Sequence, residues 1–81
     1  MEKRIGSILL KAERDCDTNL INSILSDFSS IIISRQGIPM KDKGYSLISV
    51  ILESSTDELG ALTGKLGKIA NLQVKSLLLK N

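Results

Sequence analysis

Residues 60–66 contain the glycines and the lysine of a phosphate-binding loop, but not at the spacing that such a loop requires. Gly60 and Gly64 are one residue too close together, and Leu66 stands where a serine or threonine would hold magnesium. A phosphate-binding loop also follows a strand directly, whereas this segment is expected to lie inside a helix that begins near residue 55. The pattern therefore does not predict nucleotide binding.

Cys16 is the only cysteine, and it lies between Asp15 and Asp17 at the expected start of a helix. A helix N-terminus lowers the pKa of a thiol, but the two neighbouring carboxylates oppose formation of a thiolate. The pattern favours a partly buried structural cysteine over a reactive one. Two carboxylates in one loop could bind a hard cation, but they are more common as a solvated helix start. We assign no metal ligand.

The residue types that most enzymes use are missing. The chain has no histidine, which removes both the commonest general base and the commonest transition-metal ligand. It also shows neither paired carboxylates in an apolar setting nor a nucleophile next to a base. The sequence therefore predicts no enzyme, no catalytic residue and no cofactor.

Composition also limits the partners and the compartment. One Phe and one Tyr give no stacking platform for bases, and a net charge of +2 is spread along the chain, so we expect no direct contact with nucleic acid. No segment approaches the ~20 apolar residues of a membrane span. The apolar run at residues 8–10 is too short for a signal peptide. A single cysteine fits a reducing cytosol, so we expect a soluble, cytoplasmic protein.

Apolar periodicity and turn residues predict elements in the order β-α-β-β-α-β. Strands are expected at residues 4–12, 31–33, 45–53 and 72–80, with helices from residues 15–17 to near residue 29 and over residues 56–69. Residues 37–44, bounded by glycines and containing the only proline, indicate a turn. This order predicts an α+β, ferredoxin-like sandwich with two helices on one face of a four-stranded antiparallel sheet, whose first and third strands are central. We predict one domain over residues 1–81.

Each predicted helix has one apolar face. The first helix presents five residues at helical spacing, namely Leu20, Ile21, Ile24, Leu25 and Phe28. Ser55 and Glu58 form a capping-box pattern at the start of the second helix. The core stripe of that helix is predicted to be Leu59, Leu62, Leu66, Ile69 and Ala70.

Gly60, Gly64 and Gly67 form a second stripe on this helix, away from its core face and bordered by Thr63 and Lys68. A glycine inside a helix costs about 0.8–1 kcal/mol relative to alanine, so we expect a neighbouring group to approach this backbone closely. A helix of the same domain, a second subunit or a small ligand would each fit. Gly60, Gly64, Gly67 and Thr63 are the candidate ligand- or interface-binding residues.

Both faces of the predicted sheet are apolar, although two helices can cover only one. In the third strand, one face carries Ile48, Val50 and Leu52 and the other carries Tyr45, Leu47 and Ile51. A solvated sheet face normally alternates with polar residues, so we expect a second sheet from another subunit to pack there or alongside. The β-branched edge at residues 31–33 also invites pairing with another chain. The sequence predicts a homo-oligomer.

Two strings, RQGIP at residues 35–39 and TDELGALTGKLG at residues 56–67, with Gly44 between them, resemble the iron-only hydrogenase system regulator family. MEKR at residues 1–4 and VK at residues 74–75 fit the same family, so the similarity covers essentially the whole chain. These are compact ACT-like proteins, similar to the C-terminal domain of nickel-responsive repressors. The resemblance implies an ACT-like, ferredoxin-like domain and a homo-oligomer. It also implies a regulatory role through a small effector or a protein partner.

The resemblance transfers no ligand-binding residue. Nickel-responsive domains bind metal through histidines and a cysteine, and this chain has only Cys16. ACT domains that bind amino acids often have a glycine in the turn after the first strand, and residues 13–17 contain none. No DNA-binding element accompanies the domain, so an effect on transcription would act through another protein.

Two functions remain open. The first is a stand-alone ACT-like regulatory module, in which the ligand lies between subunits near the glycine helix or the first strand–helix loop. The second is an interaction or assembly factor for redox-enzyme maturation that has no small-molecule ligand. A third class, an acylphosphatase-like enzyme, would need an arginine in a glycine-rich, phosphate-cradling loop, and Arg14 lacks those surroundings.

Overall fold

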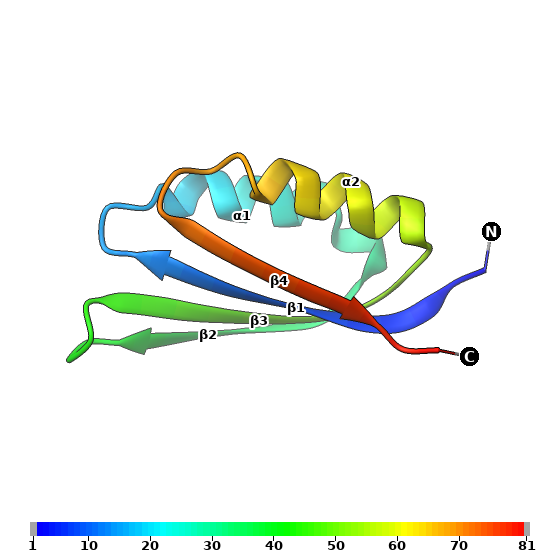
Figure 1. The fold of residues 1–81 in the computed structure, drawn as a ribbon, viewed down its shortest axis with the longest axis horizontal. Coiled ribbons are helices and arrows are strands. Elements are labelled where there is room, and N and C mark those ends of the chain that lie inside the picture. The colour runs from blue at the N-terminus through cyan, green and yellow to red at the C-terminus, as the bar shows by residue number, and fades with distance from the viewer. Residues whose placement is uncertain (1, 81) are drawn as a thin grey trace.

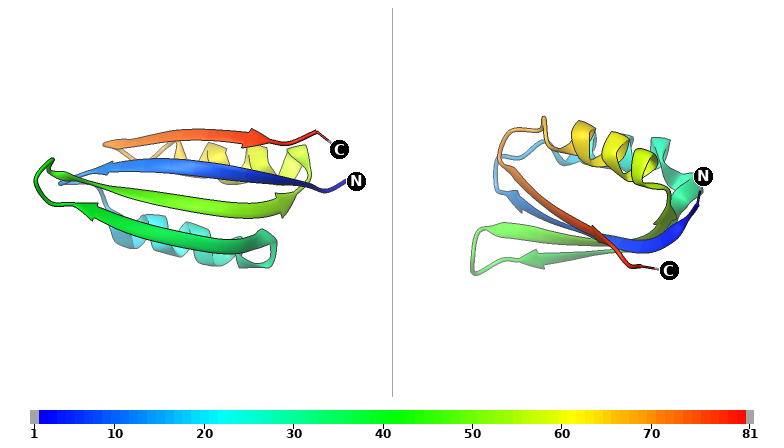
Figure 2. Two further views of the ribbon diagram at one scale, coloured as in Figure 1. Left: turned by 90° about the horizontal axis from the view of Figure 1, so that it is seen from below. Right: turned by 45° about the vertical axis from the view of Figure 1, so that its right-hand side comes forward.

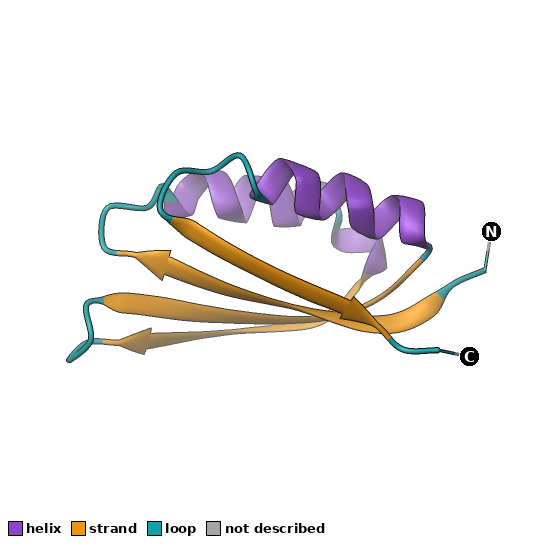
Figure 3. Ribbon diagram, viewed as in Figure 1, coloured by secondary structure: helices purple, strands orange, loops and turns teal. Residues whose placement is uncertain are grey.

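The strands and helices follow the predicted order in the computed structural model, which describes residues 2–80. The elements are β1 (Arg4–Glu13), α1 (Thr18–Asp27), the 3₁₀ turn η1 (Ser29–Ile31), β2 (Ile32–Met40), β3 (Tyr45–Ser54), α2 (Thr56–Leu66) and β4 (Leu72–Leu78). The antiparallel sheet has the order β2-β3-β1-β4, so β1 and β3 are central, as predicted. Both helices lie on one side of the sheet (Figure 1; Figure 3), which confirms the ferredoxin-like α+β fold. Met1 and Asn81, the two ends of the predicted domain, lie outside the described residues.

The core lies between the sheet and the helices. Alternate residues of the central strands face inward, and in register Leu10 of β1 lies opposite Ile48 of β3. The buried apolar side chains of the strands and helices are Ile8, Leu10, Ala12, Ile21, Leu25, Ile48, Val50, Leu52, Leu59, Leu62 and Leu66. Each buried leucine or isoleucine contributes about 1.5–3 kcal/mol, so this layer is the main source of stability.

Two residues that the helical periodicity assigned to the core are exposed instead. Leu20 lies at the margin of the apolar face of α1, and 44% of its surface remains accessible. Ala70 follows the end of α2, where the helical spacing no longer applies, and it is exposed as well. The other predicted core positions of the two helical segments are buried or half-buried.

Side chains cap both helices at their N-termini. Asp17 Oδ1 accepts a hydrogen bond from the backbone N–H of Leu20 at 3.1 Å. At α2, Ser55 Oγ accepts from the Glu58 N–H at 3.2 Å, and Glu58 Oε1 accepts from the Ser55 N–H at 2.9 Å. The predicted capping box is therefore confirmed. It satisfies two amides that have no partner within the helix.

The capping box makes stability depend on pH. The Ser55 N–H holds the pKa of the Glu58 carboxyl below its usual range, and the Lys3 ammonium adds to this shift. A carboxyl with a lower pKa in the folded state stabilises the fold above its unfolded pKa of about 4.3, and this contribution disappears as the pH falls through the folded pKa. Glu58→Gln keeps a hydrogen-bond acceptor but has no charge to lose. We expect urea unfolding to show a smaller loss of stability between pH 7 and pH 3 in Glu58→Gln than in the wild type; equal losses would contradict this role.

The second strand is longer than predicted, and the turn after it is shorter. Residues 37–40 belong to β2, so the turn consists of residues 41–44 alone. Pro39 is tolerated because β2 is an edge strand, where a missing N–H breaks no ladder bond on the open side. Ile31 is not part of the exposed edge, since it lies in η1 and is buried. The prediction of a strand at residues 31–33 was therefore wrong in its extent.

The glycine helix ends earlier than predicted. α2 stops at Leu66, and Gly67 is its C-cap, whose N–H donates to Thr63 O at 2.8 Å. The helix therefore contains two of the three glycines, not all three. Within residues 2–80, no helix is long and apolar enough to cross a membrane.

Candidate functional site

Gly60 and Gly64, which we call the glycine surface, lie on the solvent side of α2. The core side of the helix is formed by Leu59, Leu62 and Leu66, which are buried. A Cβ atom placed at either glycine would meet no other part of the described chain within 4 Å. Packing against a helix of the same domain is therefore excluded as the reason for these two glycines.

Thr63 and Gly67 have local roles in the helix. Thr63 Oγ1 donates to Leu59 O at 2.9 Å, so its hydroxyl is already bonded to its own helix. Gly67 closes the helix, and a Cβ there would come within 3.1 Å of Thr63 O. Of the four predicted site residues, only Gly60 and Gly64 present open backbone side by side on one helix face.

Two substitutions at Gly64 distinguish the effect of helix propensity on stability from the effect of side-chain bulk on a partner that approaches the helix. A Cβ at position 64 has free space around it, so both Gly64→Ala and Gly64→Leu should raise the free energy of unfolding of the isolated chain by about 0.8–1 kcal/mol. Only leucine adds bulk that would block a partner. We expect both variants to be more stable in chemical denaturation, and only Gly64→Leu to change oligomeric mass or ligand affinity. If Gly64→Leu changes neither, no partner approaches this surface.

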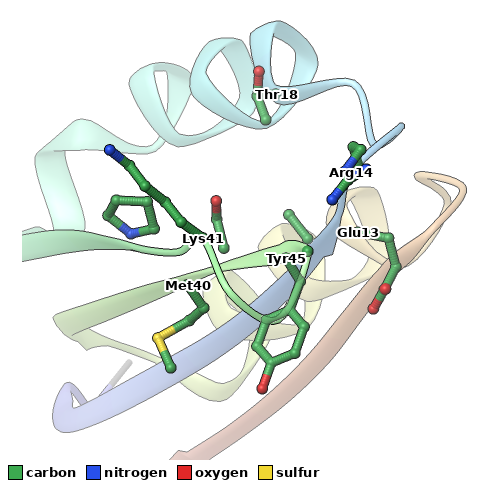
Figure 4. Close-up of a pocket in the computed structure, with 10 residues that line it drawn as sticks. Glu13, Arg14, Thr18, Met40, Lys41 and Tyr45 are labelled. Carbon is green, nitrogen blue, oxygen red and sulfur yellow. The ribbon is translucent and has the colours of Figure 1, made fainter.

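A cavity of about 300 Å³ lies at one end of the sheet, between the β1–α1 loop and the β2–β3 turn. We call it the end cavity. Both segments lie at the same end of the molecule (Figure 1). In Figure 4, Thr18 of α1 lies above the space, Arg14 and Lys41 lie on its two sides, and Tyr45 and Met40 lie below. The first strand–helix loop was one of the predicted ligand positions, but the contribution of the β2–β3 turn was missed because it depends on how the hairpin folds back.

Some of the charged side chains around the end cavity form a salt bridge and others do not. The Glu13 carboxylate extends away from the space (Figure 4) and lies 3.7 Å from Lys11 Nζ, which also lies 4.4 Å from the centre of the Tyr45 ring. Arg14 and Lys41 form no salt bridge with any acidic group of residues 2–80. Two cations and one carboxylate therefore line the cavity.

Cys16 lies in the same loop but is not available for chemistry. Burial raises the pKa of its thiol, and the carboxylates of Asp17 and Asp15 raise it further. The thiol therefore stays protonated at neutral pH, which agrees with a structural cysteine. Across the described chain, from residue 2 to residue 80, no three His, Cys, Asp or Glu side chains are grouped closely enough to hold a metal ion.

No helix covers the sheet face opposite α1 and α2, as the left view in Figure 2 shows. We call it the open face; its apolar side chains are Ile5, Leu9, Leu47, Ile51 and Leu77, from β1, β3 and β4. Leu9 and Leu77 are the most exposed, at 51% and 55%. The register also places polar residues on this face, namely Ser7, Lys11, Ser49, Glu53 and Lys75. The prediction that both sheet faces are apolar is therefore confirmed only in part.

The sequence profile of the TM1266-like family, described as "Iron-only hydrogenase system regulator, putative", matches residues 4–76. The solved structure of uncharacterized protein TM1266 from Thermotoga maritima has a TM-score of 0.92 and 34% sequence identity, over 98% of this chain and 100% of that chain. An unknown protein from Galdieria sulphuraria has a TM-score of 0.62 and 12% identity, over 99% of this chain and 47% of that chain, and shows the fold alone. No curated protein sequence is significantly similar to this chain.

Proposed function

The chain belongs to the TM1266-like family, and on this basis we propose that it is a stand-alone ACT-like regulatory module of an iron-only hydrogenase system. In this proposal the protein works as a homo-oligomer in the cytoplasm and acts by binding a small effector or a regulatory protein. It makes no direct contact with nucleic acid or membrane. Membership in a family of regulators favours binding over catalysis, so we propose no enzymatic activity.

The open face is the observation that carries this proposal. Large apolar patches on a soluble protein commonly mark an interaction site. Here the apolar side chains come from three neighbouring strands, on the face of the sheet that no helix covers (Figure 2). Two sheets can pack face to face at about 10 Å and bury such surfaces. A second copy of the chain, packed sheet to sheet, would bury the open faces of both subunits.

The glycine surface supports a second contact. Each interior helix glycine costs about 0.8–1 kcal/mol relative to alanine, and no contact within the described chain offsets this cost at Gly60 or Gly64. Close approach by a subunit or a ligand would explain why small residues stand there. We propose Gly60, Gly64, Thr63 and Gly67 as the segment that forms this contact.

The alternative is an interaction or assembly factor for redox-enzyme maturation with no small ligand. A thermal-shift screen of amino acids, nucleotides, metal ions and small organic anions separates the two functions. A regulatory module that binds a small effector is expected to be stabilised by at least one class of compound, because a ligand that binds only the folded state raises the stability of that state. If no compound in any class shifts the melting temperature, the effector-binding form of the proposal is wrong and the alternative is favoured.

A further inference from the structure

The outer edge of β4 carries backbone hydrogen-bonding groups that have no partner in the part of the chain that the structure describes. We propose that this edge pairs, antiparallel, with the same edge of a second copy of the chain, and that the two α2 helices then pack side by side. This inference rests on the proposed function, because it adds a second contact to the homo-oligomer that packs through the open face.

β4 lies at one margin of the sheet, and β1 is its one neighbour within residues 2–80. The Leu79 N–H donates to Ile5 O at 2.8 Å, and Asn71 O accepts from the Glu13 N–H at 3.0 Å. Backbone groups alternate in direction along an antiparallel strand, so the odd-numbered residues of β4 bond to β1. The even-numbered residues therefore direct their N–H and C=O groups away from the sheet.

The opposite margin of the sheet is less suited to pairing. β2 contains Pro39, which has no N–H to donate on the open side, and its register with β3 is irregular between Ile32 and Ser34. Proline and bulges protect the edges of natural sheets. β4 has neither, and its register with β1 is regular from Leu72 to Leu78. β4 is therefore the edge that remains open to pairing.

The side chains of β4 leave apolar surface at the same margin. Leu72, Val74 and Leu78 pack against the core but are only half-buried. On the other side of the strand Leu77 is 55% exposed, and Leu79, just beyond the strand, is 57% exposed. A second strand beside β4 would bury part of both sets.

α2 lies along the same margin as β4, whereas α1 lies along the margin of β2 (Figure 2). Lys65 Nζ of α2 lies 5.5 Å from the centre of the Phe28 ring, at the end of α1, so this flank of α2 faces α1. At about 100° per residue, Gly60 and Thr63 lie on the opposite flank, about 140–160° around the helix from Lys65. The free flank of α2 therefore faces outward beside the edge of β4.

The free flank of α2 carries small side chains. Its residues follow the helical spacing i, i+4, i+7 and i+11 and are Thr56, Gly60, Thr63 and Gly67. Packed helices lie about 8–10 Å apart, depending on the side chains at the contact. Pairing of two β4 edges would bring two such flanks together. Gly60, which touches no other part of the described chain, would then lie against the partner helix.

A second copy fits this margin because it offers a strand edge and a helix flank in matching positions. Twofold antiparallel pairing lets each outward N–H of β4 meet an outward C=O. Like charges directly opposite destabilise a sheet, so Lys75 excludes the register that pairs it with Lys75 of the partner subunit. A register centred on Ser76 instead places Lys75 opposite Leu77 of the partner subunit, where its methylene groups can pack on the leucine.

This contact is smaller than the one through the open face, since it consists of one strand and one helix flank. We expect it to hold only where two such contacts act at once. A dimer packed through its open faces, with both β4 strands on the same side, presents two of these edges. Two dimers joined through both edges would form a closed assembly of four chains.

A proline at position 76 tests the strand pairing in the full chain. The Ser76 N–H points away from β1, so Ser76→Pro breaks no bond within the sheet but removes the donor at the centre of the contact. By multi-angle light scattering at micromolar concentration we expect the wild type to have four times the 8.8 kDa of one chain. Ser76→Pro should have half the wild-type mass.

Gly37→Pro is the matched control, because it places a proline in the other edge strand. Gly37 lies two residues before Pro39, so its N–H also points away from the sheet, and a Cβ there meets nothing within 4 Å. Gly37→Pro should keep the wild-type mass. Circular dichroism of both proline variants should match that of the wild type.

A leucine at position 60 tests the helix contact and keeps the inference open to refutation if Ser76→Pro does not fold. Gly60→Leu adds bulk to the free flank and should also halve the mass. Ala61→Leu is its control, since Ala61 is exposed and lies about 100° further around the helix. Ala61→Leu should keep the wild-type mass.

The masses separate this inference from the proposed function. A wild type of two chains, or the wild-type mass in Ser76→Pro, would overturn the edge pairing and leave the open-face dimer in place. Halved masses in both Ser76→Pro and Gly37→Pro would also overturn it, because the effect would not be specific to β4. The wild-type mass in Gly60→Leu would overturn the helix contact. A monomeric wild type would refute the proposed function as well.

Discussion

Replacing Leu9 with glutamate is expected to convert the proposed oligomer into folded monomers. Leu9 lies on a central strand in the middle of the open face, with 51% of its surface exposed. In a sheet-to-sheet interface the new carboxylate would be taken out of water, and desolvating a charge costs several kcal/mol even when an opposite charge, here that of Lys75, lies across the strand. The dissociation constant should rise by at least about a hundredfold. Light scattering or sedimentation measures the change directly.

The monomer itself should tolerate this substitution. Position 9 lies directly opposite Lys75 in the β1–β4 register, and opposite charges across two antiparallel strands contribute about 0.2–1 kcal/mol. Circular dichroism of Leu9→Glu should therefore match that of the wild type. Loss of mass with an unchanged spectrum separates a broken interface from a broken fold.

Leu20→Glu is the control for a charge at an exposed leucine. Leu20 has a similar exposure, 44%, but lies on α1, on the other side of the sheet. It follows the N-cap Asp17 by three residues, where a glutamate suits the helix. The oligomeric mass of Leu20→Glu should be that of the wild type. If Leu9→Glu keeps the wild-type mass, or if both variants dissociate, the open face is not the interface.

Gly6→Val should be among the most destabilising single changes in the chain. Gly6 is buried in β1 opposite Leu78 of β4, and a Cβ there would overlap the Leu77 carbonyl oxygen and the Leu78 side chain. Because the carbonyl belongs to the neighbouring strand, this overlap can be removed only if β4 moves. Overpacking of this kind costs about 1–3 kcal/mol, and we expect the upper end. At about 4–8 °C per kcal/mol, the melting temperature should fall by roughly 12–24 °C.

Gly37→Val makes the same change where space is free. Gly37 lies in the edge strand β2, and a Cβ there meets nothing within 4 Å. Valine favours strands over glycine by up to about 1 kcal/mol, so Gly37→Val should be neutral or slightly stabilising. Thermal unfolding of both variants by calorimetry gives the comparison. A stable Gly6→Val protein would contradict the described packing of β4 on β1.

Local signals predicted most of the fold. The alternation in β1 and β3, the Asp17 cap and the Ser55–Glu58 capping box each depend on residues close in sequence, so they are visible without the tertiary structure. The β2 strand was cut short because glycine and proline usually end strands. Its edge position removes that restriction, and edge position is a property of the whole sheet.

The candidate site was less accessible to sequence reasoning. The helical spacing correctly placed Gly60 and Gly64 away from the core, but it could not show that Gly67 ends the helix or that Thr63 bonds to its own backbone. The end cavity joins Arg14 to Lys41, which are far apart in sequence. Their meeting depends on the register between β1 and β3 and on the hairpin that follows β2.

The central claim is that this family member works as an oligomer whose open faces are buried against each other. Multi-angle light scattering of the purified wild-type chain over a range of concentrations tests it most directly. We predict a mass of at least twice the 8.8 kDa of the monomer at micromolar concentration. A mass of 8.8 kDa at every concentration would contradict the account.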